Sequence, residues 1–268
     1  MDSDKIIFKK QKLKRLLAKF YFPLDKLLKS GPRFSVLMYH SINPNYPWSV
    51  SPQNFEDQIK YLSSNYHIAS LSDLRGFADD SIAITFDDGY EDNFYYAFPI
   101  LKKYNCPATF FICSDFIDKG KMLPEDSPYN GLKPLSPGQI NTMRKAGMDF
   151  GGHTVTHPNL AKIKIAEARD EIFSSKIFLE NVLGEKINLF AYPFGQLSDY
   201  NQGIIGILKE AGYQLACSTV WGRNNKQTPL FEIRRIRIDH IDSMGDFKGK
   251  IRGKWDFITW YHKFKKNG

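Results

Sequence analysis

The chain has 268 residues, of which 42% are hydrophobic and 25% charged, so it can build a sizeable core and disorder is excluded for most of its length. Its net charge of +8 is concentrated at the ends. Residues 1–30 hold nine Lys or Arg against three Asp, and residues 248–268 hold seven against one, which leaves a mildly acidic middle at −4. This layout argues against nucleic acid as a partner.

The N-terminal segment, residues 4–30, has the pattern of a basic amphipathic helix interrupted at Pro23, with apolar residues on one face. Such a helix either packs on the domain or lies on an anionic membrane, so residues 5–29 are candidates for peripheral membrane contact. The chain contains neither a run of about 18 apolar residues, as a spanning helix needs, nor the shorter apolar run of a secretory signal. We therefore expect a cytoplasmic protein.

After Gly31-Pro32, apolar runs alternate with helical periodicity. Strands are predicted at 34–39, 82–86, 108–112, 148–152, 189–192, 213–219 and 232–238. Helices are predicted at 52–66, 93–104, 136–146, 161–183 and 201–211, with Pro52 and Ser136 as start signals and Gly184 as a stop signal. The alternation indicates an α/β fold with a mainly parallel sheet, open or closed into a barrel.

Three segments follow from these patterns: a basic helical extension at 1–31, a central domain at 32–245, and a basic aromatic segment at 246–268. The three cysteines, an odd number without metal-type spacing, predict neither a disulfide framework nor a thiolate site.

The unusual polar residues of the central domain all come directly after predicted strands: His40, Asp87-Asp88, His153 with His157, and the Pro193–Gly195 turn. Binding sites of α/β folds collect at the carboxyl ends of the strands. We therefore expect these four loops to form one pocket.

Asp87 and Asp88 are adjacent carboxylates, and a turn at Gly89 allows them to diverge. One can then bind a cation while the other accepts a proton. The alternative is a plain Asp-Asp-Gly turn that caps a helix.

His153 and His157 lie four residues apart and can bind one metal ion, or they are two unrelated surface histidines. The Thr, Val and Pro residues around them disfavour a helix, so we expect a curled loop.

One carboxylate and two imidazoles provide three ligands and leave open positions, which suits zinc or a similar divalent ion with a bound water. A second carboxylate nearby can take a proton from that water, so the set predicts a metal-dependent hydrolase. Iron oxygenases use a similar ligand set, but their Asp usually follows closely after the first His, and no Asp follows His153 in this way.

The stretches Thr85–Tyr90 and His153–Pro158 resemble two motifs of the polysaccharide deacetylase family, the NodB-homology domains of carbohydrate esterase family 4. The resemblance covers about residues 34–240. It implies a distorted (β/α) barrel that removes N-acetyl groups from amino sugars, with a divalent metal: zinc first, with cobalt, nickel or manganese as alternatives. It also implies roles, with Asp87 as general base and Asp88, His153 and His157 as metal ligands.

The family's third motif has the form Arg-x-Pro-Tyr-Gly, and the matching stretch here is Ala191–Gly195. Ala191 stands where the family has an Arg that orients the catalytic Asp, and Arg234 or Arg235 is a candidate replacement. The segment Tyr192, Pro193, Phe194 and Gly195 is expected at the substrate, with the Phe194 amide as an oxyanion donor because a backbone N–H does not depend on the side chain. Tyr90 or Tyr192 is a candidate for a wall that stacks on sugar.

The stretch Val36–Ser41 resembles the start of a subgroup with circularly permuted motif order, which deacetylates poly-N-acetylglucosamine and places a histidine before the Asp-Asp motif. The resemblance implies that His40 is the general acid, with His240 as the alternative.

Other interpretations remain open at this point. One is a deformylase or another amidohydrolase on the same scaffold. Another is a catalytically impaired carbohydrate-binding module. A third is a membrane or nucleic-acid adaptor with a structural metal, which would need a closed fourth ligand.

Overall fold

The structure is a computed structural model that describes residues 33–76, 80–120, 131–256 and 258. The predicted basic extension at 1–31 lies outside these residues, so a membrane contact by residues 5–29 stays a prediction. Among the described residues, no helix combines the length and apolar character needed to cross a bilayer.

Seven parallel strands in the described part of the chain form a closed barrel. They follow one another around the barrel in chain order, and the last strand pairs with the first. This confirms the expected α/β barrel and selects the closed form over an open sheet. The strands are β1 (Ser35–Tyr39), β2 (Ile82–Phe86), β3 (Thr109–Ile112), β4 (Asp149–Gly152), β5 (Leu189–Ala191), β6 (Leu215–Trp221) and β7 (Ile233–Arg237).

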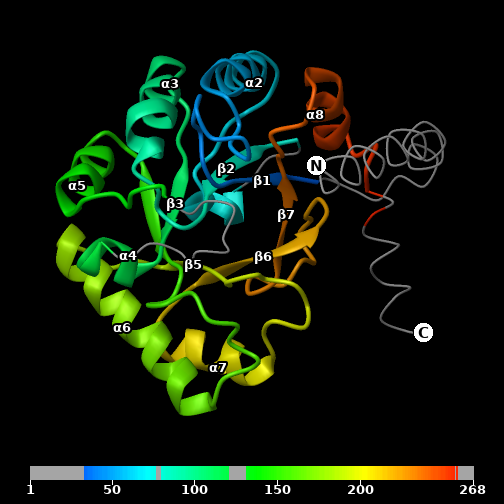
Figure 1. Cartoon of the computed structure of the whole chain (residues 1–268). Helices are drawn as coiled ribbons and strands as arrows, with labels where there is room; N and C mark the ends of the chain where they lie inside the picture. The colour runs from blue at the N-terminus through cyan, green and yellow to red at the C-terminus, as the bar shows by residue number, and fades with distance from the viewer. Residues whose placement is uncertain (1–32, 77–79, 121–130, 257, 259–268) are drawn as a thin grey trace.

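Helices surround the strands and cover the outside of the barrel (Figure 1). Most of them connect one strand to the next parallel strand, as such a sheet requires. They are α2 (Pro52–Asn65), the 3-10 turn η1 (Leu71–Gly76), the π-helix η2 (Asn93–Ala97) running into α3 (Phe98–Lys103), α4 (Ser114–Lys119), α5 (Pro137–Lys145), α6 (Ile165–Leu183), α7 (Gln202–Glu210) and α8 (Met244–Ile251).

Local signals set several helix ends as predicted. The Ser136 side chain accepts from the backbone N–H of Gln139 in a reciprocal capping box. Gly184 ends α6 in the left-handed conformation, with φ of 69°. The predicted start of α6 at 161 was wrong: the Ala161 N–H donates to Asp199 O in the loop after β5, so helix begins only at Ile165.

Alternate residues of the strands form two separate layers of core. Side chains in phase with Val36, Ala83, Phe111 and Ile233 form one cluster, which fills the barrel. The residues between them pack against the helices in a second, larger cluster. Asp87 and Arg235 share the phase of the inner cluster, so the alternation points them into the barrel.

The first part of the predicted segment 246–268 is folded against the barrel beside α2. Phe247 and Ile251 of α8 are buried, and so is Trp255. The Lys250 Nζ donates to Asp242 Oδ2 and to Asp239 Oδ2 at 2.5 and 3.2 Å. This buried lysine ties α8 to the loop that follows β7. Residues 257 and 259–268 lie outside the described part.

Candidate metal and catalytic site

Three of the predicted residues converge on one point at the carboxyl end of the barrel. Asp88 follows β2, and His153 and His157 follow β4. The Asp88 Oδ1 lies 3.4 Å from His153 Nε2 and 3.5 Å from His157 Nε2. One side-chain atom from each of the three residues falls within 4.8 Å of the others. The sequence-based ligand set is therefore brought together by the fold.

The atoms at this point have the chemistry of a cation site. The Asp88 Oδ2 accepts from the Tyr90 hydroxyl at 3.0 Å, whereas the buried Oδ1 has no hydrogen-bond partner. The His153 Nδ1 lies 2.8 Å from Ala191 O, so this nitrogen carries the proton and donates it. The Nε2 lone pair then faces Asp88. An orphaned carboxylate oxygen beside an imidazole lone pair fits a divalent ion.

Burial and charge set the protonation of these predicted ligands. Burial lowers the pKa of His157 to about 4, so its imidazole is neutral and able to ligate at neutral pH. Burial alone would raise the pKa of Asp88, but the imidazoles of His153 and His157 outweigh it and hold that pKa well below the usual range. The cluster therefore presents an ionised carboxylate.

A proton would compete with a metal ion for His153. Burial lowers its pKa, but the Asp88 and Asp87 carboxylates raise it by more, so the net direction is upward. Ligation needs the neutral imidazole, so metal binding is opposed by acid at this residue.

The loops that carry these residues adopt uncommon backbone conformations. Six non-glycine residues in the described part have positive φ, and four of them lie here: Asp88, Thr154, His157 and Phe194, at 60 to 72°. Such conformations are sparsely populated and persist only where the surroundings hold them, which is typical of functional sites. The segment between the two histidines is non-helical, as predicted.

Asp87, the second carboxylate, points into the barrel and meets Arg235 of β7. The two guanidinium nitrogens Nη1 and Nη2 donate to its two oxygens at 2.6 and 2.7 Å. Arg235 is fully buried and also donates from Nε to Ser218 O at 2.8 Å. Burial raises the pKa of Asp87, but Arg235 outweighs this and lowers it. Asp87 is therefore an ionised carboxylate with a fixed orientation.

His40 lies at the same end of the barrel. Its pKa is lowered by burial, against the opposing charges of Asp88 and Asp87. The Asn93 side chain donates to His40 O at 3.0 Å and so fixes the backbone after β1. The alternative, His240, follows β7, and its ring packs edge-on against Trp48 with centroids 5.3 Å apart. Both carboxylates of the site, Asp88 and Asp87, act on the pKa of His40.

The turn after β5 brings Phe194 to the rim. Its ring is 56% exposed and its centroid lies 5.1 Å from that of His157. Within the described residues, the Phe194 N–H donates to no protein acceptor. Gly195 has φ of 66°, and a Cβ there would lie 2.8 Å from Thr219 N, so only glycine fits this turn.

The sequence profile of the polysaccharide deacetylase family matches residues 75–216, slightly more than half of the chain. The chain belongs to this family. Among relatives, the candidate polysaccharide deacetylase YxkH of Bacillus subtilis (strain 168) is 27% identical over 214 residues, which cover 77% of this chain and 71% of YxkH. The poly-beta-1,6-N-acetyl-D-glucosamine N-deacetylase of Staphylococcus aureus (strain N315) is 30% identical over 64% of this chain, but the match spans only 61% of that enzyme.

Solved structures of deacetylases have the same fold. The Streptococcus pyogenes deacetylase PplD, in complex with acetate, matches with a TM-score of 0.72 and 26% identity over 82% of this chain and 99% of that one. The Bacillus cereus polysaccharide deacetylase BC0361 matches with a TM-score of 0.68 and 29% identity, over 82% of this chain and 69% of that one. IcaB from Ammonifex degensii has a TM-score of 0.68 and 20% identity, and this match shows the shared fold alone. The resemblance read from the motifs is thus confirmed.

Within this family the position of the arginine is the notable departure. Ala191 stands on β5 where the third motif has Arg, and Arg235 reaches Asp87 from β7 instead. Of the two candidate replacements, strand alternation selects Arg235, because Ile233 and Arg235 face the barrel interior while Arg234 faces away.

The prediction that Tyr90 or Tyr192 forms a wall that stacks on sugar was wrong. Tyr192 is buried, and its hydroxyl donates to Phe231 O at 3.0 Å, while its ring stacks on Tyr200. Tyr90 is also buried and donates to Asp88. Both side chains pack inward, so neither can reach a sugar ring. Phe194 is the exposed aromatic residue of the same motif.

The ion pair inside the barrel is testable by a double-mutant cycle on the metal-free protein. Arg235→Met should lower the free energy of unfolding by about 3–5 kcal/mol, because it leaves the Asp87 charge buried without a partner. Adding Asp87→Asn should recover part of this loss. Urea unfolding in the presence of a chelator measures all four species. Arg234→Met serves as the control on the opposite strand face, and strictly additive effects of Asp87→Asn and Arg235→Met would show that the two residues are not coupled.

Proposed function

We propose that this family member hydrolyses the N-acetyl amide of an amino-sugar glycan and depends on a divalent metal ion, with zinc as the first candidate. The observation that carries the proposal is the Asp88, His153 and His157 cluster beside an ionised carboxylate, Asp87. The S. aureus relative is named for N-deacetylation of poly-beta-1,6-N-acetyl-D-glucosamine, which supports a β-linked N-acetylglucosamine substrate. The name of the similar PplD structure includes acetate, the product of such a reaction.

Asp88, His153 and His157 would hold the ion. When bound, a divalent ion polarises a carbonyl and lowers the pKa of a water molecule, so hydrolysis runs near neutral pH. The three side chains supply one negative charge and two neutral nitrogens, a donor set that suits zinc. Tyr90 and the Ala191 carbonyl hold Asp88 and His153 in the ligating orientation.

Asp87 acts as the general base. Its carboxylate accepts a proton from the water that attacks the amide carbon, and the guanidinium of Arg235 keeps it ionised and aligned before that step. The Phe194 N–H donates to the oxygen of the amide as negative charge develops there. These two groups approach from β2 and from the turn after β5.

His40 gives a proton to the leaving nitrogen as the carbon–nitrogen bond breaks, which yields acetate and a free amine. Burial lowers the pKa of His40, so its protonated form gives up a proton more readily than an ordinary imidazolium, and the nearby Asp88 and Asp87 carboxylates favour that protonated form. His240, whose ring packs against Trp48, is the alternative acid.

The metal ligands are tested by zinc binding. His153→Ala and His157→Ala should each weaken zinc binding by at least 100-fold, because each removes one of three protein ligands. Isothermal titration of the chelator-treated protein measures this. His67→Ala is the matched control, since His67 is exposed and precedes β2 at the opposite end of the barrel. Parent-like zinc affinity in both site variants would refute the metal site.

The base is tested by acetate release from N-acetylglucosamine oligomers and polymer. Asp87→Asn should keep zinc and lower turnover by about 10²–10⁴-fold, the range of a general base. Asp118→Asn, on the exposed face of α4, should leave turnover unchanged. Parent-like release by Asp87→Asn would remove this residue from the mechanism. Formate release from N-formyl substrates without any acetate release by the parent would instead favour a deformylase.

The general acid is identified by the leaving group. His40→Asn should lower deacetylation of an amino sugar by about 10²-fold or more. The same variant should be far less impaired on an acetyl ester of an acidic phenol, which leaves without a proton. His240→Asn is measured in parallel. The two assignments must be exchanged if His240→Asn shows this pattern and His40→Asn does not.

A further inference from the structure

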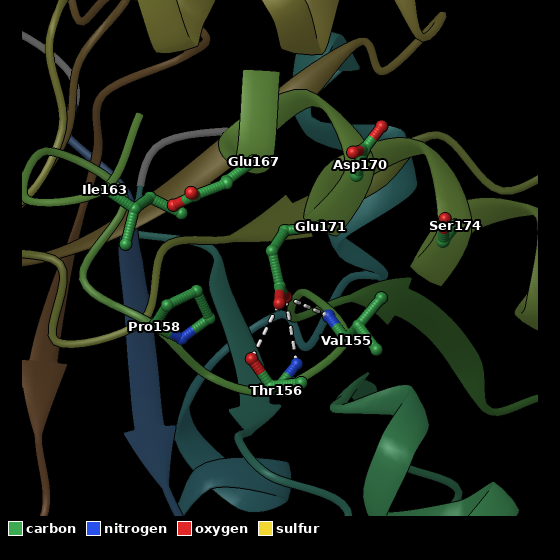
Figure 2. Close-up of a pocket in the computed structure, with 8 residues that line it drawn as sticks. All are labelled: Val155, Thr156, Pro158, Ile163, Glu167, Asp170, Glu171 and Ser174. Carbon is green, nitrogen blue, oxygen red and sulfur yellow. Dashed lines mark hydrogen bonds between the residues drawn. The ribbon is translucent and has the colours of Figure 1, made fainter. Parts of the chain in front are cut away.

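The loop that carries the two histidines is held from outside the barrel by one carboxylate of α6. The Glu171 Oε2 accepts from the backbone N–H groups of Val155 and Thr156, at 2.8 and 2.9 Å. Its Oε1 accepts from the Thr156 hydroxyl at 2.6 Å. Figure 2 shows these three bonds converging on a single side chain. Glu171 thus satisfies two consecutive amides between His153 and His157.

The carbonyl side of the same loop is bound by the start of α4. The N–H groups of Ser114 and Asp115 donate to Thr154 O and Val155 O, at 3.1 and 3.0 Å. The N–H groups of the loop therefore bind to α6, and its carbonyl groups bind to α4. The loop is clamped between these two helices of the outer layer.

This clamp acts on a backbone that would not keep its shape alone. Thr154 and His157 both have positive φ, at 68 and 62°, a region that residues with a Cβ rarely occupy. The loop has no regular helical hydrogen bonds of its own. Within the loop, the His157 N–H donates to the Thr154 hydroxyl at 3.1 Å, and the remaining support for the spacing of the two imidazoles comes from Glu171 and α4.

We infer that Glu171 is a positioning residue for the metal site: its carboxylate fixes the spacing of His153 and His157 through the loop between them. This rests on the proposed metal site. Glu171 accepts hydrogen bonds from the segment between the proposed ligands rather than from the ligands themselves, so its effect on the ion is indirect.

The surroundings of Glu171 make the idea testable without unfolding the protein. The side chain is half-buried and lines an open cavity of about 490 Å³ together with Thr156 and Asp170. Water can enter this cavity and replace a removed carboxylate at the two amides. Removing Glu171 should therefore loosen the loop rather than leave buried donors unsatisfied.

The experiment compares Glu171→Ala, Glu171→Gln and the neighbouring control Asp170→Ala. Glu171→Ala should raise the zinc dissociation constant about tenfold, a typical effect of losing support around metal ligands, measured by competition with a chromogenic chelator. Glu171→Gln should stay within about twofold of the parent, because its Oε1 can accept from both amides. Hydrogen exchange of the metal-free protein should speed up at Val155 and Thr156 in Glu171→Ala only.

A folded Glu171→Ala with the zinc affinity of the parent would overturn the proposal, and so would unchanged exchange at the two amides. If Glu171→Ala does not fold, Glu171→Gln and Glu171→Asp decide. The shorter Asp should weaken zinc binding while Gln does not, and equal affinities would reject positioning. His153→Ala separates the two ideas. If it binds zinc like the parent, the metal site itself is wrong; if it loses zinc while Glu171→Ala does not, only the role of Glu171 fails.

Discussion

The ion pair between Asp87 and Arg235 is the interaction that lets two adjacent buried carboxylates stay ionised. Two adjacent carboxylates in a buried site would raise each other's pKa, and at least one would take up a proton. Arg235 offsets this for Asp87, while the imidazoles of His153 and His157 do so for Asp88. Each carboxylate thus has its own cationic or dipolar partner, and both can stay ionised.

The turn at Asp88 and Gly89 lets the carboxylates of Asp87 and Asp88 reach different partners. Asp88 has φ of 72° and Gly89 of 81°, and the chain turns at these two residues soon after β2. Asp87 is left facing the barrel interior, and Asp88 faces the loop after β4. A buried ion pair such as Asp87–Arg235 gains little net stability over apolar residues of the same size. Its role in the proposed mechanism is to hold the Asp87 carboxylate ionised and in a fixed orientation before the proton is transferred.

Sequence patterns predicted the strands well and the helices less well, for a physical reason. Most strands, such as β1, β2 and β3, are short and largely apolar, and all seven were placed within two residues of their ends. α4 and η1 are six residues long, too short for an amphipathic period, and were missed. α8 was missed because it lies among the basic residues of the C-terminal segment, and its Lys250 gives no sign in sequence of being buried.

The residues of the candidate site that lie in short sequence motifs were predictable, whereas those that lie far apart along the chain were not. Asp88, His153 and His157 sit in short motifs, so their meeting needed only a parallel barrel. Arg235 lies 148 residues from Asp87, and choosing it over Arg234 required the phase of β7, which a single sequence does not define. Tyr90 and Tyr192 were misjudged because a tyrosine beside a motif gives no sign of the face on which its ring lies.

The two halves of the site are supported by different layers of the fold, and this has a mechanical consequence. Asp87 is held inside the barrel by Arg235, whose other contacts, Thr85 and Ser218, also belong to strands. His153 and His157 depend on a loop clamped by α4 and α6 in the outer layer. Outer helices can open locally without disrupting a closed sheet. Loosening of α6 near Glu171 would then move the proposed metal ligands while the Asp87–Arg235 pair stays intact, so we expect metal binding and the alignment of the proposed base to be separable.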